Sequence, residues 1–133
     1  EERAVLYEPP NRIEDGQRLV ESGCRCAIDL SDGLVKDLKR ILRHSGVGAE
    51  LNWNRIPVDP RARTRSSEEF QALQWALSGG EDFELLFTLP EGTDPSASHY
   101  TMIGQITEGD GLDWSPERPE ELQQAPAGYD HFE

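Results

Sequence analysis

Two carboxylates and a serine, close together in one short segment, are the first residues of this sequence that could do chemistry. In Asp29-Leu30-Ser31-Asp32-Gly33 the two aspartates lie three positions apart. Carboxylate oxygens are ligands that Mg²⁺ prefers, and phosphate oxygens often complete its coordination. Ser31 could donate a hydrogen bond to such a phosphate. On the residues alone, a helix cap formed by Ser31 or Asp32 explains the pattern slightly better than a ligand site.

Two further segments carry polar and aromatic groups in positions suited to binding. In Gly79-Gly80-Glu81-Asp82-Phe83-Glu84, paired glycines favour a sharp turn that exposes acidic side chains, although a simple helix stop fits as well. In Gly128-Tyr129-Asp130-His131-Phe132, the rings could pack on the domain or lie against a cationic heterocycle. No Ser or Cys partner in a recognisable motif accompanies His131, so a nucleophilic triad is not supported.

The excess of acidic side chains limits which kinds of molecule the chain is expected to bind. The chain has 133 residues, with 26 acidic and 13 basic side chains and a formal net charge of -13. Such a chain repels a phosphate backbone and an anionic membrane surface, so neither nucleic acid nor a membrane is expected as a partner. Substrates complexed with magnesium stay possible, because a divalent ion reverses the local sign of the charge.

Cysteine content and chain length bear on compartment and domain organisation. Cys24 and Cys26 are too few for a disulfide framework, which favours a reducing, cytoplasmic location. The length fits one domain, residues 1–133. The polar start without methionine leads us to expect a piece of a longer polypeptide.

The elements that must position the first segment are a strand before it and a helix after it. Residues 24–28 read as a short buried strand that delivers Asp29. Residues 34–44 read as a helix, because Leu34, Leu38 and Ile41 fall on one face. Gly46 is expected to end this helix.

The rest of the chain mixes helices and strands. We expect helices over 13–22 and over 66–77, the second with Ser66 and Glu69 in a capping box. Further strands are expected over 47–53, 83–89, 100–106 and 112–114, and a loop over 57–65. The order of these elements predicts an α+β fold, with helices packed on a mixed β-sheet.

The segments, taken in order, resemble the thiamine-monophosphate kinase family. The motifs that carry the resemblance are Asp-Leu-Ser-Asp-Gly-Leu at 29–34, His-Ser-Gly-Val-Gly-Ala at 44–49, Gly-Gly-Glu-Asp-Phe-Glu-Leu at 79–85, Ile-Gly-Gln-Ile at 103–106 and Gly-Tyr-Asp-His-Phe at 128–132. Leu30 and Phe83 replace the more usual Ile and Tyr, which are mild changes. The resemblance implies a fold like the C-terminal domain of aminoimidazole ribonucleotide synthetase. It also implies an N-terminal ATP-binding domain that this chain lacks, and a homodimeric full-length protein.

The resemblance also implies roles for five residues. Asp29 and Asp32 would bind Mg²⁺, Ser31 an ATP phosphate, and Glu81 and Tyr129 thiamine monophosphate. The reaction would transfer the γ-phosphoryl group of ATP to thiamine monophosphate to give thiamine diphosphate. The attack is direct in this family, so no residue is expected to act as a catalytic nucleophile. We expect the chain alone to be inactive, because half of the site would be missing.

Two other functions stay open at this point. One is a sister enzyme of the same superfamily with another phosphate acceptor, although its motifs around the first segment differ. The other is a non-catalytic binding module, with which the acidic surface and the expected missing domain are compatible.

Overall fold

The computed structural model describes residues 9–68, 70–93 and 99–123. Glu69, one half of the expected capping box, and Tyr129, with the whole third segment, lie outside these residues. No helix in the described part of the chain is long and apolar enough to cross a bilayer.

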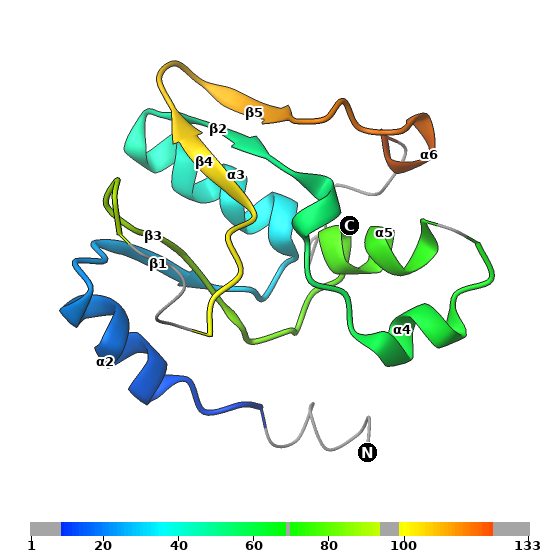
Figure 1. The fold of residues 1–133 in the computed structure, drawn as a ribbon, viewed down its shortest axis with the longest axis horizontal. Coiled ribbons are helices and arrows are strands. Elements are labelled where there is room, and N and C mark those ends of the chain that lie inside the picture. Colours follow the sequence, from blue (N-terminus) through cyan, green and yellow to red (C-terminus); the bar gives the residue numbers. More distant parts are fainter. Residues whose placement is uncertain (1–8, 69, 94–98, 124–133) are drawn as a thin grey trace.

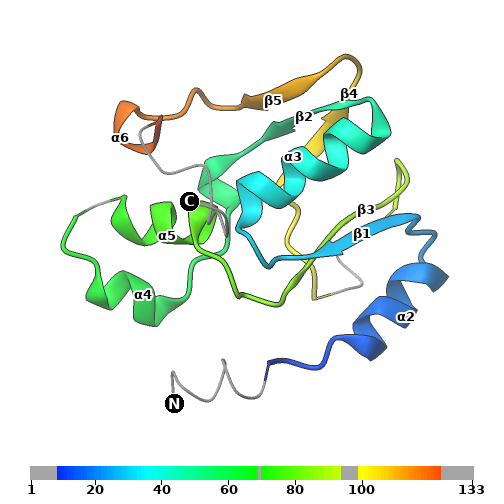
Figure 2. The same cartoon turned by 180° about the vertical axis from the view of Figure 1, so that it is seen from behind.

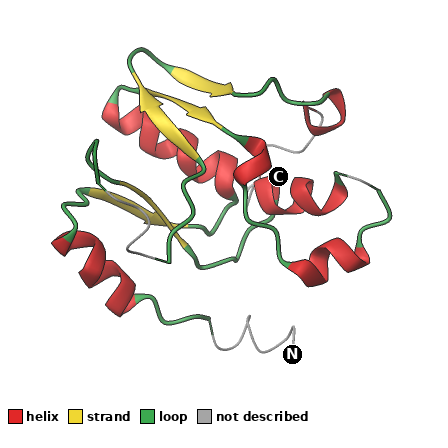
Figure 3. Ribbon diagram, in the orientation of Figure 1, coloured by secondary structure: helices red, strands yellow, loops and turns green. Residues whose placement is uncertain are grey.

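The strands form two small sheets on either side of a central helix (Figures 1 and 3). In the first sheet, β1 (Cys26–Asp29) pairs antiparallel with β3 (Leu85–Thr88). In the second, β2 (Gly48–Leu51) runs antiparallel to β4 (Gly104–Thr107) and parallel to β5 (Gly111–Trp114). The α+β class with a mixed sheet is confirmed, and the strands divide into two sheets rather than one.

The central helix is α3 (Leu34–Ser45), which packs against β1, β5 and the helix α5 (Gln71–Ser78) (Figures 1 and 2). Its apolar face contributes to two core clusters. The first cluster joins α3 to α5 and contains Leu34, Val35, Ile56 and Leu77. The second joins α3 to β2 and contains Leu38, Leu42, Ala49 and Leu51. The sequence periodicity therefore predicted both the helix and its buried face.

The ends of the helices follow local sequence signals. Gly46 ends α3 with a left-handed backbone, φ 63°, as expected for a C-terminal glycine. The first described helix, α2 (Ile13–Glu21), also agrees with expectation and buries Leu19. A short 3₁₀ turn, η1 (Trp53–Arg55), follows β2, and α6 (Glu120–Gln123) follows β5.

One expected loop is a helix. Residues 60–65 form α4 (Pro60–Arg65), because the Asp59 carboxylate accepts a hydrogen bond from Arg61 N–H at 2.7 Å and proline occupies the first turn. Ser66 ends α4 instead of starting the next helix, and its N–H donates to the Ala62 carbonyl. The helix expected from Ser66 begins only at Gln71.

The strands are shorter than expected. Those predicted over 24–28 and 47–53 occupy Cys26–Asp29 and Gly48–Leu51. The strand predicted from Phe83 begins at Leu85, because Glu81 and Phe83 have left-handed φ angles of 64° and 53°. The strand predicted over 100–106 occupies Gly104–Thr107, while the one expected at 112–114 is present as β5.

Candidate functional site

The first and second sequence segments meet in the fold. We call residues 29–33 the aspartate loop and residues 79–84 the glycine turn. Backbone hydrogen bonds join them: Leu30 N–H donates to the Glu84 carbonyl at 2.9 Å, and Phe83 N–H donates to the Leu30 carbonyl at 3.0 Å. A third bond, 2.9 Å long, runs from Glu81 N–H to the Ser31 carbonyl. Two segments about fifty residues apart therefore form one surface.

Glycines permit this close approach. A Cβ atom on Gly33 would lie 3.0 Å from the Gly79 carbonyl oxygen and 2.9 Å from that of Ser78 just before the turn, and the φ of 110° at Gly33 also disfavours any other residue. A Cβ atom on Gly80 would run into the Ser31 carbonyl oxygen. The two glycines are therefore needed where the aspartate loop and the glycine turn touch.

A buried carboxylate that we did not predict holds the aspartate loop. Asp37, in the first turns of α3, is fully buried. Its Oδ2 accepts hydrogen bonds from Ser31 N–H at 3.1 Å and Asp32 N–H at 3.0 Å. Its Oδ1 accepts one from Arg40 Nη1 at 3.0 Å. A sequence signal existed, because Asp37 lies three positions after Leu34 and thus on the apolar face of the helix.

The same arginine reaches the aspartate loop directly. Arg40 Nη2 donates to Asp32 Oδ2 at 2.6 Å, and Lys36 Nζ lies 3.8 Å from the same oxygen. The hydrogen bond to Asp32 and the charges of Asp32, Asp37 and Asp29 raise the pKa of Arg40 above its ordinary value. Arg40 is thus the positive centre of a cluster of three aspartates.

The four predicted site residues that the structure describes are close in space but differ in exposure. Asp29 and Glu81 are exposed, and Ser31 is half-buried. Asp32 is buried, with 8% of its surface exposed. Asp29, Ser31 and Asp32 share the aspartate loop, and Glu81 is joined to that loop by its backbone. The fifth, Tyr129, cannot be placed, because it lies outside the described residues.

The donors suit Mg²⁺ in kind but are too few for a complete site. Within residues 9–68, 70–93 and 99–123, no group of three His, Cys, Asp or Glu side chains could hold a metal ion. Asp29 presents an exposed carboxylate, while Asp32 is engaged by Arg40 and Lys36. The residues therefore fit a metal whose other ligands are phosphate oxygens or groups outside this part of the chain.

The glycine turn carries a second cluster of charges. Asp82 is exposed overall, but neighbouring atoms partly shield its carboxyl group from water, and this shielding, followed by the Glu84 charge, raises its pKa above the ordinary value. Glu84 itself accepts a hydrogen bond from Arg12 Nη2 at 2.5 Å, which ties the start of α2 to the turn. The turn therefore has one carboxylate, Glu84, that a cation stabilises, and another, Asp82, whose charged form is disfavoured.

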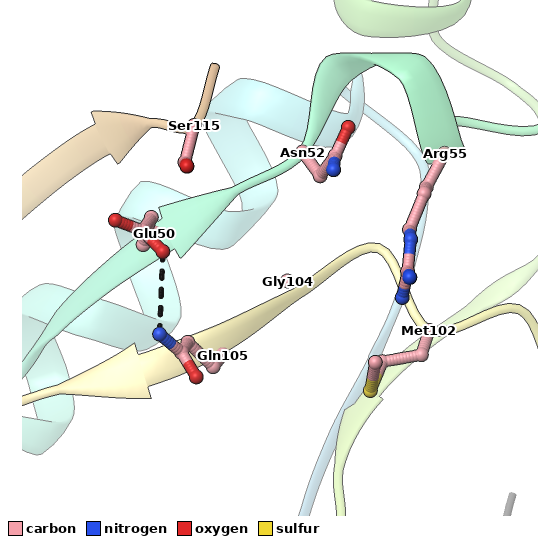
Figure 4. A pocket seen from close by; sticks show the side chains of 7 residues that line it. All are labelled: Glu50, Asn52, Arg55, Met102, Gly104, Gln105 and Ser115. Atoms are coloured by element: carbon pink, nitrogen blue, oxygen red, sulfur yellow. Dashed lines mark hydrogen bonds between the residues drawn. The ribbon is translucent and has the colours of Figure 1, made fainter.

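A pocket of about 180 Å³ lies against β2 and β4 (Figure 4). Its lining residues come from these strands, from η1 and from the segments that flank them: Glu50, Asn52, Arg55, Met102, Gly104, Gln105 and Ser115. Gln105 donates to Glu50 across the two strands at 3.2 Å. None of the four predicted site residues that the structure describes lines the pocket, so it is separate from the aspartate loop.

Comparisons with known proteins agree with the fold. Residues 1–114 match the family described as AIR synthase related protein, C-terminal domain. The chain is 42% identical to the thiamine-monophosphate kinase of Escherichia coli (strain K12), over 93% of this chain and 40% of that protein. It is 37% identical to the enzyme of that name from Methanopyrus kandleri, over 84% of this chain and 36% of that protein.

Solved structures give the same result. One described as AaThiL complexed with AMPPCP and TMP has a TM-score of 0.79 and 28% identity, over 97% of this chain and 40% of that chain. The thiamine-monophosphate kinase of Stenotrophomonas maltophilia K279a has a TM-score of 0.75 and 32% identity, over 86% of this chain and 38% of that chain. The chain thus spans about 40% of the length of the proteins it matches. It belongs to the family of AIR synthase related protein C-terminal domains.

Proposed function

We propose that this chain is the C-terminal domain of a thiamine-monophosphate kinase, which transfers the γ-phosphoryl group of ATP to thiamine monophosphate. The main support for the proposal is that backbone hydrogen bonds bring the aspartate loop and the glycine turn together. Through them, the serine suited to a phosphate and the glutamate suited to the acceptor are neighbours, linked by the bond from Glu81 N–H to the Ser31 carbonyl at 2.9 Å. The similarity to kinases of this name supports the same reaction.

Each residue has a proposed part in this reaction. Asp29 and Asp32 would bind Mg²⁺, Asp32 by exchanging its contact with Arg40. Ser31 would donate its hydroxyl proton to an ATP phosphate, and Glu81 and Tyr129 would contact thiamine monophosphate. When bound, magnesium would neutralise charge on the phosphate oxygens. Phosphoryl transfer needs alignment and charge neutralisation more than a protein nucleophile, and accordingly none is assigned.

The partner domain is part of the proposal. Because the chain spans about 40% of its relatives, we propose that a preceding domain supplies the rest of the ATP and magnesium site. The full-length protein is proposed to be a homodimer in the cytoplasm, where ATP is available and the free cysteines stay reduced. The chain alone should show no measurable kinase activity, and robust turnover by it would contradict this division of the site.

The test is a kinase assay on the polypeptide that carries both domains. With ATP, Mg²⁺ and thiamine monophosphate, we expect thiamine diphosphate as product, and Asp29→Asn should lower turnover at least tenfold. Asp113→Asn, which removes another exposed carboxylate from β5, is the control and should leave turnover unchanged. Turnover of another phosphate acceptor in preference would favour a sister enzyme. A protein that binds neither substrate would favour a non-catalytic module.

A further inference from the structure

Among the described aspartates near the candidate site, Asp37 alone is fully buried and out of reach of a substrate. It is fully buried, whereas Asp29 is exposed. The helix brings it back towards the aspartate loop, since its own N–H donates to the Gly33 carbonyl at 2.9 Å. A buried charge is costly unless donors surround it. Here three donors do so: the amides of Ser31 and Asp32, and the Arg40 guanidinium.

These three bonds fix the aspartate loop in two ways. The hydrogen bonds from the Ser31 and Asp32 amides to Asp37, 3.1 and 3.0 Å long, fix the backbone from which the Ser31 hydroxyl and the Asp32 carboxylate project. The bond to Arg40 holds a guanidinium that in turn contacts the Asp32 carboxylate at 2.6 Å. Both the backbone and the side chain of Asp32 therefore depend on Asp37.

The hydrogen bonds from these two amides to Asp37 also limit how the loop can bind an anion. Free N–H groups before a helix commonly hold phosphate. In this loop the Asp37 carboxylate already accepts from Ser31 and Asp32 N–H, so these amides are not available to a ligand. Ser31 and Asp32 are therefore left with their side chains for recognition, and a carboxylate of the protein itself holds the backbone that directs them.

We propose that Asp37 is a positioning residue for phosphoryl transfer, which orients Ser31 and Asp32 without touching substrate or metal. This role rests on the proposed function, because Ser31 and Asp32 matter only if the loop binds phosphate and metal. Loss of such a supporting hydrogen-bond partner costs about 10- to 100-fold in activity in comparable sites. A residue that served folding alone would change the amount of active protein but not the constants of each folded molecule.

The experiment compares Asp37→Asn with Leu38→Ala in the two-domain polypeptide. Asparagine keeps the size of the side chain but loses the charge that binds both amides and Arg40. We expect kcat/KM for ATP, per folded molecule, to fall by about 10- to 100-fold. Leu38→Ala removes a neighbouring buried side chain of α3 and should lower stability while leaving kcat/KM unchanged.

A double mutant separates positioning from a general effect. If Asp37 acts through Ser31, Asp37→Asn should cost much less in a Ser31→Ala background than in the wild type. Fold-changes that multiply independently, or an equal loss of kcat/KM in Leu38→Ala, would overturn the positioning role.

Amide hydrogen exchange gives a readout that does not need activity. In the wild type, the Ser31 and Asp32 amides should exchange much more slowly than that of Asp110, which lies in the exposed turn between β4 and β5. Asp37→Asn should accelerate both, and if that variant fails to fold, rapid wild-type exchange at either amide would still overturn the inference. An inactive wild-type polypeptide would overturn the proposed function, whereas unchanged exchange in an active one would overturn the role of Asp37 alone.

Discussion

The two segments that form the candidate site share backbone hydrogen bonds, but they differ in what else holds them. The aspartate loop is held by side chains, chiefly the buried Asp37 and the Arg40 that bridges it to Asp32. The glycine turn is held mainly by its backbone bonds to Leu30 and Ser31, with one side-chain contact, from Arg12 to Glu84. Two of its non-glycine residues, Glu81 and Phe83, have left-handed φ angles of 64° and 53°. Side chains of the following helix α3 therefore hold the first segment, whereas the second keeps two residues in strained backbone conformations where it contacts the first.

This difference teaches where each segment can change. Apart from Gly33, where it touches the neighbouring turn, the aspartate loop depends on charged partners, so changes of charge should disturb it most. The glycine turn depends on space and on backbone conformation, so changes at Cβ should disturb it most. Residues held in rare backbone conformations at a candidate site indicate that their side-chain direction matters more than local stability.

The largest effect should come from Gly33→Ala, which acts where the two segments touch. The new methyl group would lie 2.9 Å from the Ser78 carbonyl oxygen, on a backbone with φ of 110°. We expect the free energy of unfolding, measured by urea denaturation, to fall by about 3 kcal/mol. Gly109→Ala, with φ of 92° and open space around its Cβ, is the matched control for the backbone cost alone. Equal losses in the two variants would show that the contact between the segments is not tight.

Arg40→Gln should disturb the aspartate loop alone. It removes the bonds to Asp32 and Asp37, and because 44% of the arginine side chain is exposed we expect a loss of only about 1 kcal/mol. Calorimetric titration of the two-domain polypeptide should also show tighter Mg²⁺ binding, because Asp32 loses the nearer of the two cations, Arg40 and Lys36, that compete with the metal. Arg43→Gln removes the same charge one turn later, at an exposed position. If both variants titrate alike, Asp32 is not a metal ligand.

Glu81→Gly should stabilise the glycine turn while weakening substrate binding. Glycine adopts a φ of 64° without strain, so we expect a net gain of about 0.5 kcal/mol after its larger unfolded-state entropy is counted. The KM for thiamine monophosphate should rise, because the carboxylate is lost. Glu81→Gln keeps the strain and removes only the charge, so it should raise KM without the gain in stability. A less stable Glu81→Gly would mean that the side chain has a structural role.

The sequence predicted the elements around the aspartate loop because their signals are local, but a helix cap by Ser31 or Asp32 is wrong, since Gly33 precedes α3 and no side chain caps the helix. The strand before the loop, the apolar spacing of Leu34, Leu38 and Ile41 after it, and the stop at Gly46 all depend on neighbours in the chain. The missed helix α4 also had a local signal, since Asp59 before Pro60 is a good helix start. The signal was overlooked because the helix itself is polar and has no apolar face. Asp37 had one too, as a charged residue on an apolar face.

Other features depend on pairing between distant residues and could not be read locally. The division into two sheets follows from β2 joining β4 and β5, while β1 joins only β3. Gly79 and Gly80 predicted a turn, yet the left-handed residues are Glu81 and Phe83. Gly80 is needed instead for its close approach to Ser31, which no single segment reveals. The roles of the site residues stay predictions, and Tyr129 lies outside the described residues.

Asp82→Asn should have the smallest effect, and its sign tests the electrostatics of the glycine turn. Shielding from water and the Glu84 charge raise the pKa of Asp82 above its ordinary 3.8, so the folded state binds a proton more tightly than the unfolded state does. Ionisation of Asp82 therefore destabilises the fold as pH rises through this window, and asparagine should raise the melting temperature at pH ~7. The gain should disappear below the ordinary pKa, where both states are protonated.

Asp110→Asn is the control for this last variant, because it removes one negative charge from the same strongly acidic chain at an exposed turn. Any stabilisation that comes only from a smaller net charge should be equal in the two variants. A melting temperature that rises more in Asp82→Asn, and only above the ordinary pKa, would show that the turn carries a locally unfavourable charge. Such a charge fits a segment that retains strain and repulsion where a ligand is proposed to bind. Equal shifts of the melting temperature in the two variants at every pH would show that the glycine turn carries no locally unfavourable charge, so that only its backbone strain would distinguish it from the aspartate loop.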